Sequence, residues 1–77
     1  MDSPQELVAK LNAERRELTS KIEALEAFTT HPDFYTSALS FDDRNLIFSQ
    51  LHIMKAYSAI IHHRLIRAAN KVSMTER

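Results

Sequence analysis

The pattern of apolar and polar positions is strongest between Ser40 and Asn70, where it has the period of a helix. Positions that recur at steps of three and four residues predict one long helix over residues 41–70 with a wide apolar face. Ser40 is expected to cap the first turn, with Asp43 as the acidic partner of a capping box. A helix this apolar on one side needs cover from the rest of the chain or from another copy. The positions of this face are Leu46, Ile47, Gln50, Ile53, Met54, Tyr57, Ile60, Ile61, Arg64, Leu65 and Ala68.

An earlier stretch has a narrower pattern, in which apolar residues alternate at the a and d positions of a heptad repeat. Ser3, Pro4 and Glu6 carry the signals of a helix start: an N-cap, a proline at the first helical position and a capping-box acid. The pattern predicts a helix over residues 4–28, in which Arg15 is the polar exception. Its seam positions are Val8, Leu11, Arg15, Leu18, Ile22 and Leu25.

Residues 29–39 are expected to connect the two helices, because Pro32 disfavours helical geometry at the residue before it. One short helical turn is expected to begin at Pro32. The segment is rich in aromatic side chains for a loop. We expect Phe34, Tyr35 and Phe41 to fold down and close that end of the molecule.

Together these elements predict an all-α fold, in which an antiparallel two-helix hairpin occupies residues 1–77 as a single domain. The last residues, 71–77, are polar and are expected to fray. The longer helix has a wider apolar face than its partner can cover. We therefore expect a homodimer or higher oligomer, most simply a four-helix bundle made from two hairpins. The alternative is that the spare face binds a different protein.

Composition narrows the classes of function. The chain has no Cys and no Gly, which removes disulfides, thiolate metal sites and glycine-rich phosphate loops. It has no apolar run long enough for a membrane span and no secretory signal, so a soluble cytoplasmic protein is expected. Nine acids and four bases give residues 1–43 a charge of −5, and six bases and one acid give residues 44–77 a charge of +5. The net charge of zero argues against binding to duplex nucleic acid.

The sequence contains no arrangement typical of catalysis or of metal binding. Ser58 lies four residues before His62, a spacing that occurs by chance in many helices. His62 and His63 point about 100° apart on a helix and cannot chelate one ion together. We therefore expect a protein that is not an enzyme and that has no metal and no cofactor.

Polar residues within the apolar faces are the candidate binding residues. Gln50, Tyr57 and Arg64 recur at seven-residue spacing on the second helix. Two interpretations stay open: such residues can set helix register and oligomeric state, or they can line a groove. In a groove, the Tyr57 ring would stack on a ligand and the arginines would hold phosphate or carboxylate. The candidate binding residues are Arg15, Tyr57, His63, Arg64 and Arg67, and the wider cationic cluster adds His62 and Lys71.

The order of residues from Glu14 to Leu65 resembles a family of small phage and prophage accessory proteins. The shared elements read E..EL..KI..LE.F, then an aromatic-bearing connector, then L...Q...M..Y..I...RL. A looser similarity joins the chain to the helical-hairpin sponges with which phages sequester cyclic nucleotide signals, although the tyrosine-to-lysine spacing ahead of their first helix is not found here. In this sequence the elements are Glu14, Glu17, Leu18, Lys21, Ile22, Leu25, Glu26, Phe28, Phe34, Leu39, Leu46, Gln50, Met54, Tyr57, Ile60 or Ile61, Arg64 and Leu65.

The resemblance implies a helical hairpin encoded among early genes, which often act against host defence or host regulators. The leading prediction is a non-enzymatic, phage-type accessory protein of the host cytoplasm that binds a host protein as a counter-defence inhibitor. One alternative is an oligomeric sponge for a phosphate-bearing cyclic nucleotide, and another is a structural coiled-coil adaptor. The expected partners are another copy of the chain and either a host protein or a cyclic nucleotide. No binding to a membrane is expected. The residues that would hold a nucleotide between protomers are Arg15, Tyr57, Arg64 and Arg67.

Overall fold

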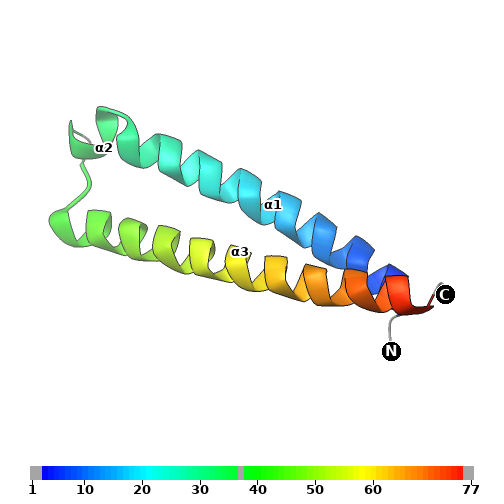
Figure 1. Ribbon diagram of the computed structural model, residues 1–77. Helices are drawn as coiled ribbons and strands as arrows, with labels where there is room; N and C mark the ends of the chain where they lie inside the picture. The colour runs from blue at the N-terminus through cyan, green and yellow to red at the C-terminus, as the bar shows by residue number, and fades with distance from the viewer. Residues whose placement is uncertain (1–2, 37, 76–77) are drawn as a thin grey trace.

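A computed structural model of the protein describes residues 3–36 and 38–75, and within these ranges it contains helices and no strands. Two long helices, α1 (Pro4–Thr30) and α3 (Phe41–Thr75), are joined through a single helical turn, α2 (Asp33–Thr36). Figure 1 shows α1 lying antiparallel along α3, which brings both ends of the chain to the same end of the molecule. The molecule is a rod that measures 57 × 18 × 16 Å along its principal axes. The predicted all-α antiparallel hairpin is confirmed.

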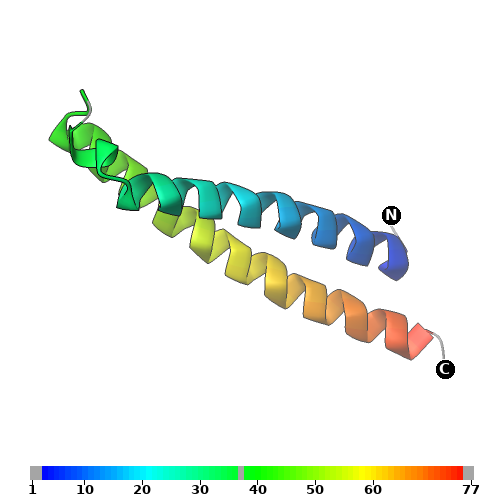
Figure 2. The ribbon, with the colours of Figure 1, turned by 90° about the horizontal axis from the view of Figure 1, so that it is seen from above.

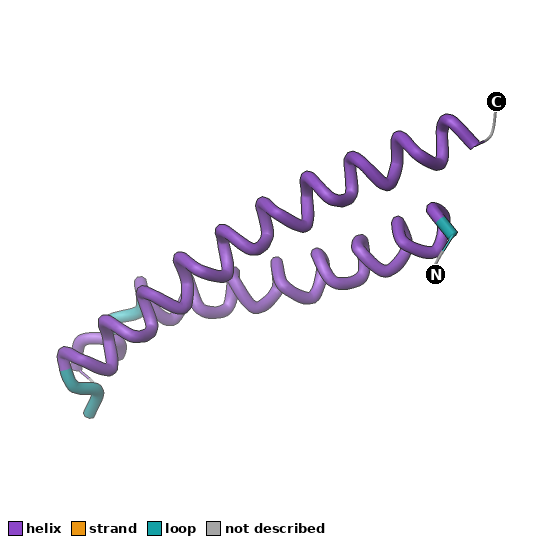
Figure 3. The backbone as a smooth tube through the Cα atoms, turned by 90° about the horizontal axis from the view of Figure 1, so that it is seen from below, coloured by secondary structure: helices purple, strands orange, loops and turns teal. Residues whose placement is uncertain are grey.

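The two long helices twist around each other along the rod. Viewed as in Figure 1, they are farthest apart at the connector and draw together toward the termini. In Figure 2, which is turned by 90°, they overlap near the connector and separate toward the termini. Figure 3 shows the same crossing from below. This winding keeps heptad positions of one helix turned toward the other along the whole contact.

Both long helices begin at the predicted capping boxes. The Ser3 hydroxyl oxygen accepts a hydrogen bond from the Glu6 amide at 3.2 Å. The Ser40 hydroxyl oxygen accepts one from the Asp43 amide at 3.1 Å, and the Asp43 carboxylate accepts one in return from the Ser40 amide at 3.2 Å. These bonds satisfy amide groups that have no partner inside the helix, so the helix starts are determined locally.

α1 ends at Thr30, two residues later than predicted. The hydroxyl groups of Thr29 and Thr30 donate hydrogen bonds to the backbone carbonyl of Glu26, at 2.9 and 3.1 Å, and these bonds hold the last turn closed. His31 then takes an extended backbone conformation as the C-cap. The predicted effect of Pro32 on the residue before it accounts for this end point. The predicted short turn after Pro32 is confirmed as α2.

One aromatic side chain closes the connector end of the rod. Phe34, in α2, is fully buried, and its ring makes edge-to-face contacts with Phe28 of α1 and Phe48 of α3 at centroid distances of 5.3 and 5.2 Å. The predicted aromatic plug is confirmed for this residue. It is wrong for Tyr35 and Phe41, which are 64% and 70% exposed. Consecutive helical residues point about 100° apart, so the single turn of α2 directs only one ring inward.

The apolar core runs along the contact between α1 and α3. Its most buried side chains are Leu11 of α1 and Ile61 and Ala68 of α3. Leu51 is also buried and lies on the same side of α3, although it falls outside the positions predicted for the apolar face. Partly buried side chains complete this core, namely Leu7, Val8, Leu18 and Leu65.

α3 continues to Thr75, so the prediction of a frayed tail from residue 71 is wrong for residues 71–75. Val72 lies seven residues after Leu65 and is half-buried, so it extends the heptad contact with the start of α1. Residues 76 and 77 lie outside the described part of the chain. Among the described residues, no helix has the length and apolar character needed to cross a membrane.

Candidate functional site

The wide apolar pattern of the second helix divides between two faces of α3. One face, here the inner face, packs toward α1 with Ile47, Leu51, Met54, Ile61, Leu65 and Ala68. A second set of apolar side chains points to solvent and recurs at seven-residue spacing: Leu46 is 68% exposed, Ile53 69%, Ile60 54% and Met74 74%. Arg67 occupies the fourth place in this series. We term Leu46, Ile53, Ile60, Arg67 and Met74 the outer stripe of α3.

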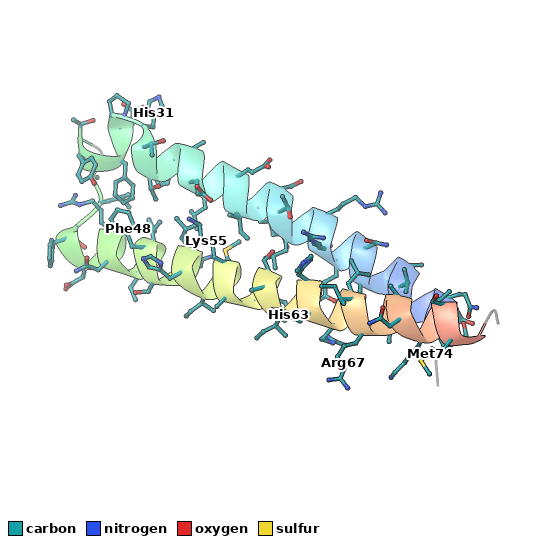
Figure 4. All side chains as sticks on the ribbon, viewed as in Figure 1. His31, Phe48, Lys55, His63, Arg67 and Met74 are labelled. Carbon is teal, nitrogen blue, oxygen red and sulfur yellow. The ribbon has the colours of Figure 1, made fainter. Side chains whose placement is uncertain are left out.

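α3 carries no acidic side chain from Arg44 to Thr75. Acidic groups reach it from α1 instead, because the hairpin brings the acidic half of the chain against the basic half. Lys55 forms an ion pair with Glu26 of α1 at 3.4 Å. Figure 4 shows Lys55 on the side of α3 that faces α1. Away from α1, the charge of α3 is therefore positive in the described part of the helix after Asp43.

Three of the predicted binding residues lie on this exposed positive surface. His63, Arg64 and Arg67 are exposed, and Figure 4 shows His63 and Arg67 pointing away from α1 together with Met74. Arg64 and Arg67 are three residues apart, which places them on neighbouring turns of one helix flank. Their guanidinium groups can bind phosphate or carboxylate through paired N–H donors.

Tyr57 stands at the edge between the inner face and the outer stripe. Its hydroxyl group donates a hydrogen bond to the Glu14 carboxylate of α1. This bond, and then the negative charge of Glu14, raise the pKa of Tyr57 above its ordinary value of 10.0, while the positive charge of Arg64 opposes the shift. Tyr57 as a whole is 41% exposed, so it keeps an accessible surface for a ligand. An open depression beside it is lined by Glu14, Glu17, Leu18, Lys21 and Tyr57.

Within one chain, Arg15 lies apart from the other four predicted binding residues, which are all on α3. It is half-buried in α1 and borders a depression lined by α1 residues alone. Glu14 contacts Tyr57, and the next residue in a helix points about 100° away. Arg15 therefore projects from the flank of α1 opposite to the one that carries Glu14. The structure brings together Tyr57 and Arg64, with His63 and Arg67 on the adjoining outer surface, and it separates Arg15 from them.

The polar residues of the second helix are not buried in the contact between α1 and α3. Gln50, Tyr57 and Arg64 are all exposed in the hairpin. They therefore cannot set the register of α1 against α3 as buried polar groups would. Any role in register belongs to a contact with another molecule.

Glu14 belongs to the pattern shared with small phage proteins, but the sequence did not place it among the candidate binding residues. Its link to Tyr57 joins positions 43 residues apart. Neither helical period nor local spacing reports such a contact. The available signals were its place next to the seam of α1 and its place at the start of the shared pattern.

Comparison with known proteins gives one family. The model of the Sequestin family matches residues 5–67, which is most of the chain and includes all five predicted binding residues. No curated protein and no solved structure is significantly similar to this chain.

Proposed function

The chain belongs to the Sequestin family, and on this premise we propose that it acts by sequestration: it binds its target stoichiometrically and holds it without converting it. The proposed target is a phosphate-bearing nucleotide of the cyclic signalling type. Sequestration without conversion requires neither a nucleophile nor a metal. It needs a surface that recognises phosphate and a flat base, together with a means to enclose them.

One observation carries the choice of target. Arg64 and Arg67 are exposed on a helix that has no acidic side chain after Asp43 in its described length, and the accessible Tyr57 ring lies beside them. Guanidinium groups bind phosphate through paired hydrogen bonds, and an aromatic ring stacks on a base at about 1–3 kcal/mol. The part of α3 that carries Arg64 and Arg67 adds no carboxylate that would repel a phosphate, and the nearest acid at Tyr57 is Glu14 of α1, which holds the Tyr57 hydroxyl group.

The same geometry limits what a single chain can do. Tyr57, Arg64 and Arg67 are exposed on α3 and the depression beside Tyr57 is open, so one hairpin does not enclose a nucleotide. Ligand sites usually bury most of the ligand surface. A sequestering site therefore needs a second wall, which another copy of the chain would supply. Arg15 has no part in this version of the site, because it projects from the opposite flank of α1.

Thermal unfolding with a panel of cyclic nucleotides tests the proposal. A ligand present at 100 times its Kd stabilises the folded state by about 2.7 kcal/mol, which shows as a clear rise in Tm. Arg64→Glu should abolish the rise. Arg16→Glu is the matched control, since Arg16 is an exposed arginine of α1 that donates a hydrogen bond to the Asn12 carbonyl of its own helix at 3.4 Å. If no cyclic nucleotide raises the Tm, the proposal is wrong.

A second candidate is that the target is a host protein, as expected of a phage-type counter-defence inhibitor. The exposed outer stripe favours it, because contiguous apolar side chains on a surface mark contacts with other proteins. Native mass spectrometry of the protein purified from a bacterial host would show a stoichiometric complex that Ile53→Glu removes. Recovery of the chain with no protein bound to it would count against this candidate.

A further inference from the structure

We propose that the outer stripe of α3 is covered by the outer stripe of a second copy that runs antiparallel to it. Four of its five members are large apolar side chains that are more than half exposed. They recur every seven residues over four heptads, from Leu46 to Met74. A seven-residue repeat of this length fits a partner that is itself a helix, wound around α3 as a coiled coil.

The charge pattern of the stripe identifies the partner and its direction. Asp42 lies one turn before Leu46 on this side of α3, and Arg67 lies near the other end. In a parallel pair, Arg67 would face Arg67 and Asp42 would face Asp42. In an antiparallel pair of identical helices, the acidic start of each α3 lies beside the basic end of the other. A second copy therefore supplies complementary charge without any other molecule.

The isoleucines select the register. If Ile53 of each copy opposes Ile60 of the other, both isoleucine pairs come together around a two-fold axis. One heptad further out, Leu46 opposes Arg67 of the second copy. The aliphatic stem of Arg67 then covers Leu46, and its guanidinium group reaches Asp42, which lies about 6 Å further along the axis at 1.5 Å per residue. The two-fold axis makes this Arg67–Asp42 pair twice.

The second copy would stand on the side of α3 that adjoins α1. Each member of the outer stripe directly precedes a position of the inner face, as Ile53 precedes Met54 and Ile60 precedes Ile61. The two stripes are therefore about 100° apart around the helix, which is the geometry of a four-helix bundle rather than of a flat row of helices.

The interface would also complete the proposed ligand site. Tyr57 lies four residues after Ile53 of the outer stripe and four before Ile61 of the inner face. Arg64 lies four residues after Ile60 and one before Leu65. They therefore lie in the angle between α1 and the second copy, where a nucleotide would be enclosed on two sides. Because Arg67 pairs with Asp42 in this interface, Arg64 is the arginine that would hold the phosphate in the dimer. The interface itself is independent of the proposed function, and only this ligand cleft rests on it.

Sedimentation equilibrium of the ligand-free full chain tests the interface. The wild type should form dimers, and Ile60→Glu should leave a helical monomer, with helicity confirmed by circular dichroism. Ile66→Glu is the matched control, because Ile66 is a 45% exposed isoleucine on the same helix outside the outer stripe. A wild-type chain that stays monomeric at high concentration, or an Ile66→Glu variant that dissociates as fully as Ile60→Glu, would overturn the proposal.

A charge exchange tests the direction. Arg67→Glu and Asp42→Arg should each raise the dimer Kd roughly tenfold, since each turns two attractive pairs repulsive. The double variant should restore the wild-type Kd. Double-variant dimers as weak as the single variants would refute the antiparallel pairing. A dimer that binds no nucleotide would contradict the proposed function alone. A wild-type chain that binds a nucleotide as a monomer would contradict this interface and the need for a second wall, and would leave sequestration of the nucleotide standing.

Discussion

The inner and outer faces of α3 are built from the same kinds of residue at the same spacing, yet they differ in what covers them. Ile61 is fully buried against α1, while its neighbour Ile60 is 54% exposed. Both repeat every seven residues with apolar companions. A helical period therefore reports how many faces a helix must bury, and it does not report which partner buries each face.

The difference matters for stability because the molecule is small. Full burial of one isoleucine contributes about 1.5–3 kcal/mol relative to leaving it exposed. A chain of 77 residues buries a modest core, and a two-helix hairpin has no enclosed interior beyond one seam. Burial of the outer stripe by a partner would therefore add stabilisation that the single chain does not have.

The difference between the two faces is tested most directly by truncating one isoleucine on each. Ile61→Ala should lower the free energy of unfolding by about 2–5 kcal/mol, because it opens a cavity at a fully buried position. Ile60→Ala should cost about 0.5 kcal/mol or less in the monomer. Denaturant unfolding at a protein concentration below the dimer Kd measures both. Equal losses would mean that the two faces are not distinct.

Ser40→Ala should lower the free energy of unfolding by about 1 kcal/mol, because it removes the N-cap of α3, the helix that carries both faces. Ser49→Ala is the control within the same helix. Ser49 is exposed, and alanine has the higher helix propensity, so this change should be neutral or slightly stabilising. Thermal unfolding of the two variants measures the difference. A Ser40→Ala variant as stable as the wild type would contradict the assigned cap.

The ion pair between Lys55 and Glu26 marks the inner side of α3, and we expect it to contribute at most about 1 kcal/mol. Both side chains are about half exposed, with fractions of 50% and 47%, so water and salt screen the attraction. A double-mutant cycle with Lys55→Gln and Glu26→Gln, measured at low and high salt, gives the coupling. A coupling energy that grows with salt would contradict this account.

The smallest expected effect on stability lies at Tyr57, on the edge between the faces. Its pKa is raised above 10.0 in the folded chain by the hydrogen bond to Glu14, so the folded state keeps a proton that the unfolded state releases. This contribution is present below pH 10 and is lost as the pH rises through the folded-state pKa. In a Tyr35→Phe background, phenolate absorbance reports Tyr57 alone, and Glu14→Gln should lower its midpoint. An unchanged midpoint would exclude the hydrogen bond as the cause.

The helix starts could be predicted from the sequence because capping depends on residues three positions apart. Ser3 with Glu6 and Ser40 with Asp43 form the expected bonds. The end of α3 was predicted too early, since the polar tail conceals Val72, which continues the heptad contact. Among the aromatic residues of the connector, the pattern could not separate Phe34, which is buried, from Tyr35, which is exposed.

The candidate site was predicted less completely than the fold. Tyr57 and Arg64 do lie together, because their spacing on one helix already placed them on one flank. Arg15 was grouped with them because it occupies a seam position, and the hairpin turns it to the far flank of α1. The contact of Glu14 with Tyr57 could not be predicted, because it joins two helices and depends on how they pack.

The order of amino acids alone decides that this chain makes two long helices, where each begins, and that the second has more apolar surface than the first can cover. These properties depend on neighbours within one or two turns. The folded molecule decides which half of that surface α1 covers, which aromatic ring closes the connector, and which arginines stand beside Tyr57. Those outcomes depend on the rotation of one helix against the other, and contacts between residues distant in the chain set that rotation.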